Sequence, residues 1–98
     1  MDVVHRLNDI EFVWDRKKAG SNLRKHGVAF PTACEVFFDP FVCLIGTEVA
    51  GGERREVVIG MTIDWRVLRV VYVFRNDRIR VVSARPVTAQ ERKSYEDQ

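Results

Sequence analysis

Residues 54–85 constrain the fold more than any other part of the chain. They contain three runs rich in β-branched residues, REVVIGMTI, RVLRVVYVFR and RIRVVSAR, which are separated by Asp64-Trp65 and by Asn76-Asp77. Apolar residues that alternate along such runs predict strands, and Asn-Asp suits a two-residue hairpin turn. The sequence therefore predicts an antiparallel meander of three strands.

Two-residue turns would fix the register of this meander, with Ile63 opposite Arg66 and Arg75 opposite Arg78. Because paired residues share a face, the two faces can be written down. The first would be hydrophobic and covered by helices: Val57, Ile59, Met61, Leu68, Val70, Tyr72, Phe74, Ile79 and Val81. The second would hold five arginines against one glutamate: Arg54, Glu56, Arg69, Arg75, Arg78 and Arg80. This second face is either an anion-binding surface or an ordinary solvated face on which arginine stems cover apolar neighbours.

Helices and further strands are predicted around the meander. IEFVWD reads as a strand, and Asp15 can cap a helix over residues 16–26 that ends at Gly27. A second helix begins near Pro31 and stops at Asp39-Pro40, and FVCLIGTEV is a strand. Thr88 and Glu91 form a capping-box pattern at the start of a C-terminal helix.

Composition predicts one soluble, cytoplasmic domain. The chain has 98 residues, with 16 basic and 14 acidic side chains, so only the distribution of charge can indicate a nucleic-acid partner. We expect a single domain over residues 1–98, in which residues 1–10 are an N-terminal extension. No run approaches the roughly 20 apolar residues of a membrane span, and no signal peptide is visible.

The two cysteines do not suggest a metal site. Cys34 and Cys43 lie outside any CxxC pattern and away from histidines at metal-ligand spacing. They read as reduced core residues, with a disulfide as the alternative. No metal and no cofactor are expected.

His26 has two interpretations. It lies in NLRKHGVAF, between a lysine and a glycine at the predicted end of a helix. A helix C-terminus favours cations in its last turn and glycine just beyond it, so the residue is explained without chemistry. A histidine also titrates near neutral pH and suits proton transfer. His5, in the N-terminal segment, has no comparable context.

Three stretches, taken in order, resemble the BrnT toxin family: FVWDRKKAGSNLRKHGVAFPTACEVFFDP, then VIG, then VVYVFRNDRIRVVSARPVTAQERKSYE. Family members show an F-x-W-D start, an N-x-x-K-H-G helix end, and I-R-[IV]-[IV]-S-A-R followed by E-R-x-x-Y-E. The resemblance runs from Phe12 to Glu96. The family commonly has a lysine directly after S-A-R, where this chain has Pro86, so that side chain and a backbone donor are both missing.

This resemblance implies a fold, an activity and a partner. The fold would be α+β and RelE-like, with a small antiparallel sheet, two helices packed on one face and a C-terminal helix. The activity would be that of a type II toxin–antitoxin toxin, a metal-independent endoribonuclease that inhibits translation. A BrnA-like ribbon-helix-helix antitoxin would neutralise it in a hetero-oligomer, and the toxin would reach DNA only through that antitoxin. The alternative is a non-catalytic module of the same fold within a DNA-bound repressor complex.

Metal-independent RNA cleavage uses the 2′-hydroxyl as nucleophile. The reaction needs a proton acceptor, positive charge at the phosphorus, and an acid for the departing 5′-oxygen. The candidate catalytic residues are Arg75, Arg80, Arg85, His26 and Tyr95. The candidate RNA-binding residues are Arg54, Arg69, Arg78 and Lys25.

Several of these candidates also have a structural explanation. The two-residue turns place Arg85 on the core-side face at the end of the sheet, where pairing with a carboxylate is the alternative to phosphate contact. Tyr95 suits base stacking or proton donation, and equally the docking of a terminal helix. Glu35 and Glu91 are the candidate bases, although capping already explains Glu91.

Overall fold

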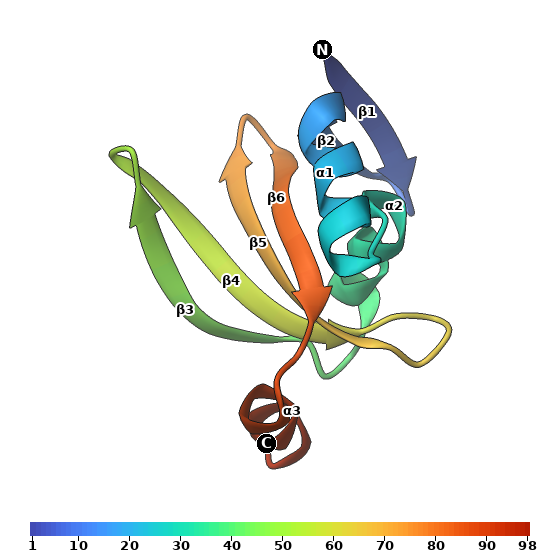
Figure 1. Ribbon diagram of the computed structural model, residues 1–98, viewed down its shortest axis with the longest axis vertical. Helices are drawn as coiled ribbons and strands as arrows, with labels where there is room; N and C mark the ends of the chain where they lie inside the picture. The colour runs from blue at the N-terminus through green and yellow to red at the C-terminus, as the bar shows by residue number, and fades with distance from the viewer.

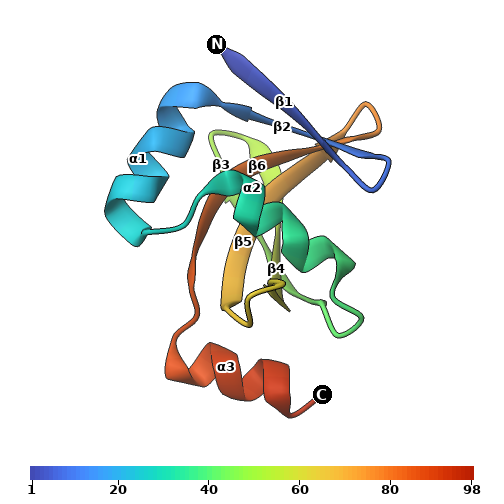
Figure 2. The same ribbon diagram turned by 90° about the vertical axis from the view of Figure 1, so that its right-hand side faces the viewer.

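The computed structural model describes residues 1–98 as a six-stranded mixed sheet with helices on both faces (Figures 1 and 2). The strand order is β1-β2-β6-β5-β4-β3, and only β2 and β6 are parallel neighbours. The elements are β1 (Asp2–Leu7), β2 (Ile10–Asp15), α1 (Arg16–His26), α2 (Phe30–Ala33), the 3-10 helix η1 (Cys34–Phe38), β3 (Cys43–Ala50), β4 (Glu53–Met61), β5 (Val67–Arg75), β6 (Arg78–Pro86) and α3 (Ala89–Glu96). The α+β prediction is confirmed, with a mixed rather than a wholly antiparallel sheet.

The predicted turn between the first two runs is wrong. Met61 pairs with Val67, so residues 62–66 form the loop in place of Asp64-Trp65 alone. The loop is closed by a hydrogen bond from Thr62 N to Arg66 O at 2.8 Å, and Glu35 accepts one from Ile63 N at 2.9 Å. The register of β4 is therefore displaced by one residue, which exchanges its two faces.

The second turn is confirmed, but the hairpin that it starts is irregular. Asn76 and Asp77 both have positive φ, and Arg75 pairs with Arg78. Farther along the hairpin, Tyr72 pairs with Val81 while Val71 pairs with Ser83, which leaves Val82 as an extra residue. Such a bulge reverses the faces of all later residues of the strand relative to a regular ladder.

The main core lies between the sheet and α1, α2 and η1. It includes Phe12, Val28, Phe30, Leu68 and Val70, each at most 1% exposed. Gly60 allows η1 to approach the sheet, because a Cβ at this position would lie 2.8 Å from Val36 Cβ and 2.9 Å from its carbonyl oxygen. A smaller cluster of Ile59, Val67 and Tyr95 occupies the opposite face, where α3 docks.

Helix α1 packs against the edge of β6 beyond the point where β2 ends. Asn22, which is buried, substitutes there for a neighbouring strand. Its Oδ1 accepts a hydrogen bond from Ala84 N at 3.1 Å, and its Nδ2 donates to Ala84 O at 2.8 Å and to Val28 O at 3.0 Å. These bonds satisfy buried backbone groups and fix the C-terminal half of α1 against β6.

The predicted helix ends are confirmed. The Asp15 side chain accepts a hydrogen bond from Lys18 N, and Gly27 ends α1 in the left-handed conformation. Thr88 and Glu91 form both bonds of the capping box. Residues 2–7, within the expected N-terminal extension, form the edge strand β1. Both cysteines are free, and no helix is long and apolar enough to cross a membrane.

Candidate functional site

Six arginines share the sheet face opposite α1 and α2, hereafter the arginine face. The register places them on three adjacent strands: Arg55 on β4, Arg69 and Arg75 on β5, and Arg78, Arg80 and Arg85 on β6. Two sequence assignments are corrected here. Arg54 lies on the other face because the β4 register is displaced, and Arg85 joins the arginine face because of the Val82 bulge.

Every arginine of this face is paired with a carboxylate. The partners come from β1, β2, β3, β4 and α3, and the pairs are Arg55–Glu53, Arg69–Glu48, Arg69–Glu91, Arg75–Glu53, Arg78–Glu11, Arg80–Asp2 and Arg85–Glu91. The expected excess of five arginines over one glutamate is therefore wrong. That expectation counted only residues of the meander, whereas most of the carboxylates come from elements outside the meander.

The least exposed of these groups surrounds Glu91 at the start of α3. Arg85 donates two hydrogen bonds to this carboxylate, Nη1 to Oε1 and Nη2 to Oε2, each of 2.9 Å. Arg69 Nε lies 3.5 Å from Oε2, and its Nη2 donates to Glu48 of β3 at 2.7 Å. The side chains of Arg69, Glu91 and Arg85 are 20%, 20% and 31% exposed. Arg85 holds the pKa of Glu91 below its usual range, so this carboxylate is ionised at neutral pH.

A second group lies at the opposite end of the β5–β6 hairpin. Arg80 makes a bidentate contact with Asp2 at 3.0 and 2.9 Å, and this contact lowers the pKa of Asp2. Arg75 and Arg78 flank it at the turn, with side chains 62% and 47% exposed. The predicted catalytic arginines are thus divided, with Arg85 near α3 and Arg75 and Arg80 near the turn.

Tyr95 attaches α3 to the rest of the molecule. It is 8% exposed, and its hydroxyl donates to Asp39 Oδ2 at 2.5 Å. Asp39 also accepts hydrogen bonds from the backbone of Phe41 and Met61. Burial and the neighbouring Asp39 raise the pKa of Tyr95 to about 12. Its surroundings in this structure are those of a docking residue.

Lys25 and His26 lie elsewhere, in a shallow groove of about 210 Å³ between α1 and β6, hereafter the α1 groove. It is lined by Lys18, Ser21, Asn22, Lys25, His26, Val82 and Ser83. This lining contains two lysines and a histidine but no carboxylate. None of the basic residues of α1 forms an ion pair. This groove therefore carries uncompensated positive charge, which the arginine face does not.

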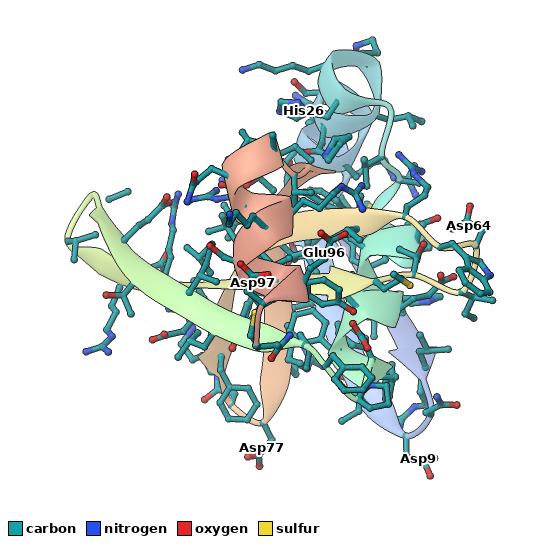
Figure 3. The ribbon with its side chains drawn as sticks, turned by 90° about the horizontal axis from the view of Figure 1, so that it is seen from below. Asp9, His26, Asp64, Asp77, Glu96 and Asp97 are labelled. Carbon is teal, nitrogen blue, oxygen red and sulfur yellow. The ribbon has the colours of Figure 1, made fainter.

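The α1 groove and the Glu91 group are on the same side of the molecule. In Figure 2 the C-terminal end of α1 and the N-terminal end of α3 lie on the same side of the molecule. Figure 3 shows the labelled His26 on that side as well. Asp77, in the β5–β6 turn, lies at the opposite side of Figure 3. His26 therefore lies on the side of the molecule where α3 begins, and the β5–β6 turn, next to Arg75 and Arg78, lies on the opposite side.

A family model described as ribonuclease toxin, BrnT, of type II toxin–antitoxin systems matches residues 14–91 of this sequence. The chain belongs to the BrnT family. It is accordingly assigned to the ribonuclease toxins of type II toxin–antitoxin systems. A comparison with curated proteins finds no match. The matched region contains α1, the complete meander and the start of α3, up to Glu91.

Sequence reasoning missed one residue of the arginine face, Arg55, and one contact of Glu91, a residue that it had named. Arg55 was on neither list of predicted face residues, because the assumed two-residue turn put its neighbour Arg54 on the charged face instead. Glu91 was explained by its capping box, which is present, but the same carboxylate also contacts two arginines from distant strands. The E-R-x-x-Y-E motif contains Glu91. Because the capping box already explained this residue, its contacts with Arg69 and Arg85 were not predicted.

Proposed function

We propose that this BrnT-family protein is a metal-independent endoribonuclease of the cytoplasm, whose cleavage of RNA inhibits translation. A BrnA-like ribbon-helix-helix antitoxin neutralises it in a hetero-oligomer, through which the toxin reaches DNA. The observation that carries this proposal is the Arg69–Glu91–Arg85 group, with the α1 groove on the same side of the molecule. It combines phosphate-binding guanidinium groups with unpaired basic side chains.

The phosphate at the cleaved bond lies, in this proposal, against Arg85 and Arg69. A guanidinium has five N–H donors. Arg85 uses two on Glu91 and one on Pro86 O, which leaves two for a phosphate. A donor that is already fixed when charge develops contributes on the order of 3 kcal/mol to catalysis.

The α1 groove holds a neighbouring part of the RNA strand. Lys18 and Lys25 attract phosphates, and their free amines require no ion pair to be broken. We assign His26 as the acid for the departing 5′-oxygen, since imidazole is the side chain that ordinarily exchanges protons near neutral pH. Arg75, Arg78 and Arg80 extend the RNA contact toward the β5–β6 turn.

We assign Tyr95 no contact with RNA in the docked position of α3, because its hydroxyl is engaged by Asp39. Arg54 is assigned none either, because it lies on the face of α1 and α2.

A non-catalytic role in a repressor complex is the second candidate function. It is favoured by the complete pairing of the arginine face, since a paired guanidinium attracts phosphate less than a free one. Pro86, at the position where the family commonly has a lysine, also favours this non-catalytic role.

The deciding experiment uses purified protein and single-stranded RNA in buffer with EDTA. We expect cleavage to continue in chelator and to leave 2′,3′-cyclic phosphate and 5′-hydroxyl ends, whereas RNA with 2′-deoxy sugars stays intact. Expression should arrest growth and co-expression of a BrnA-like antitoxin should restore it. Intact RNA and normal growth at high expression would support the non-catalytic role. Cleavage abolished by EDTA would overturn metal independence.

A further inference from the structure

The proposed ribonuclease reaction needs a group that accepts the proton of the 2′-hydroxyl. Since the 2′-oxygen becomes bonded to phosphorus, the group that takes its proton must lie beside the groups that bind the phosphate. We propose that Glu91 is this general base. The inference rests on the proposed function and adds a catalytic residue to it.

The position of Glu91 distinguishes it from the other carboxylates of the arginine face. It is 20% exposed, against 36%, 44% and 51% for Glu53, Glu48 and Asp2. Glu11 is similarly covered, but both of its partners, Arg6 and Arg78, are largely exposed at 63% and 47%. Glu91 alone lies within a group whose three side chains are all partly buried, where electrostatic contacts are stronger than in water.

Glu91 is also held in place before any substrate arrives. Its Oε1 accepts a hydrogen bond from Thr88 N at 2.9 Å, and its own N–H donates to Thr88 Oγ1 at 3.2 Å. Arg85 fixes both carboxylate oxygens from the sheet. A base fixed by its backbone and by a strand loses little freedom when the substrate binds.

The carboxylate of Glu91 takes the 2′-hydroxyl proton while the 2′-oxygen forms a bond to phosphorus. The bond from phosphorus to the 5′-oxygen breaks, and that oxygen takes the proton of the acid assigned to His26. The products are a 2′,3′-cyclic phosphate and a 5′-hydroxyl. Glu91 then returns its proton to solvent, and His26 regains one.

The charged groups around Glu91 set the state in which it works. Arg85 faces it from β6 and Arg69 from β5, and Glu48 of β3 stands on the far side of Arg69. The two guanidinium groups keep Glu91 ionised at neutral pH, so it carries no proton when the substrate arrives, although they also make it a weaker base than a free carboxylate. Cleavage is therefore expected to fall as pH drops through the pKa of Glu91.

The test compares Glu91→Gln with Glu48→Gln and Thr88→Ala. Glutamine keeps an oxygen for Thr88 N and Arg85 but accepts no proton at this pH. Glu48→Gln neutralises the other carboxylate on Arg69, and Thr88→Ala weakens the capping box while leaving Glu91 intact. We expect Glu91→Gln to lower the cleavage rate about 100-fold or more and to leave RNA affinity unchanged or higher, because Arg85 and Arg69 lose their anionic partner. Glu48→Gln should stay within a few-fold of the wild type per folded molecule. Thr88→Ala removes one contact that positions Glu91 and should cost less activity than Glu91→Gln.

Two results would overturn the assignment. One is a Glu91→Gln variant that binds RNA and cleaves it as fast as the wild type, or faster, which would mean that Glu91 only neutralises the arginines. The other needs no variant: a wild-type rate that does not fall at acidic pH, while circular dichroism shows folded protein. If wild-type protein cleaves no RNA at all, the proposed function fails together with this inference; if it cleaves and Glu91→Gln cleaves equally, only the base is wrong.

Discussion

The arginine face and helix α1 carry the same kind of charge in opposite circumstances. Each arginine of the sheet has a carboxylate within 4 Å, from Asp2 of β1 to Glu91 of α3. Helix α1 contains RKKAGSNLRKH, with no acidic residue and no ion pair. Formal charge is thus a poor measure of the charge that a polyanion meets, because neighbours decide how much remains uncompensated.

Because of this difference, we expect the two regions to contribute to RNA binding in different ways. An unpaired lysine in solvent increases RNA affinity, because its binding releases counterions from the phosphate backbone. Such a lysine does little to fix the orientation of the RNA. A guanidinium held by a carboxylate is weaker as an attractor but fixed in direction, which favours selective contact with a reacting phosphate. We therefore expect the lysines of α1 to govern affinity, and the Glu91 group together with His26 to govern rate.

The largest effect is expected from Arg85→Ala. It removes the bidentate partner of Glu91 and a donor for the phosphate, so cleavage should fall by about 100- to 1,000-fold. Arg54→Ala is the matched control, since Arg54 lies on the other face and should change the rate little. Equal losses in single-turnover cleavage by both variants would break the division between faces.

The next effect concerns affinity. Replacing Lys18 and Lys25 together by alanine should weaken RNA binding about tenfold and reduce the salt slope by about 1.4 for a single strand. The melting temperature should hardly change, because neither side chain is in an ion pair. Lys17→Ala with Lys93→Ala removes the same charge outside the groove. A titration in which both double variants bind alike would remove the α1 groove from the site.

Tyr95→Phe separates docking from chemistry. Loss of the hydroxyl that donates to Asp39 should lower the free energy of unfolding by about 1–2 kcal/mol and the melting temperature by about 5–10 °C. Cleavage per folded molecule should remain. An inactive variant with an unchanged melting temperature would restore Tyr95 as a catalytic residue.

The smallest effect is a pH dependence of stability that comes from carboxylates whose pKa values are lowered in the folded protein. The pKa values of Glu91 and Asp39 are lowered in the folded protein, in the first case by Arg85 and in the second by hydrogen bonds that outweigh burial. The unfolded chain therefore binds more protons in acid, so this contribution to stability is complete above the usual carboxyl pKa values of 4.5 and 3.8 and is lost as pH falls below them. Denaturant unfolding at several pH values should show this slope flattened by Asp39→Asn, and unchanged by Lys17→Ala.

Local features were predicted well from the sequence. The caps at Asp15, Gly27 and Thr88 depend on residues a few positions apart, and all three are present. The Asn76-Asp77 turn is likewise a local feature that was predicted and is present.

Features that depend on distant contacts were not predicted. The β4–β5 loop is held by Glu35 from η1, and a two-residue turn was assumed in its place. The Val82 bulge has no signal in the pattern of apolar residues, yet it moves Arg85 to the opposite face. The partners of the arginines come largely from β1, β2, β3 and α3, so the charge of the candidate site depends on residues far away in sequence.

The amide of Asn22 has a consequence for how this sheet can grow. It occupies the donor and acceptor of Ala84, the backbone groups with which an incoming chain would otherwise extend β6 past the end of β2. Additional strands from another molecule must then join at β1 or at β3, the two outermost strands of the sheet. One buried side chain therefore limits the directions from which a partner can continue the sheet.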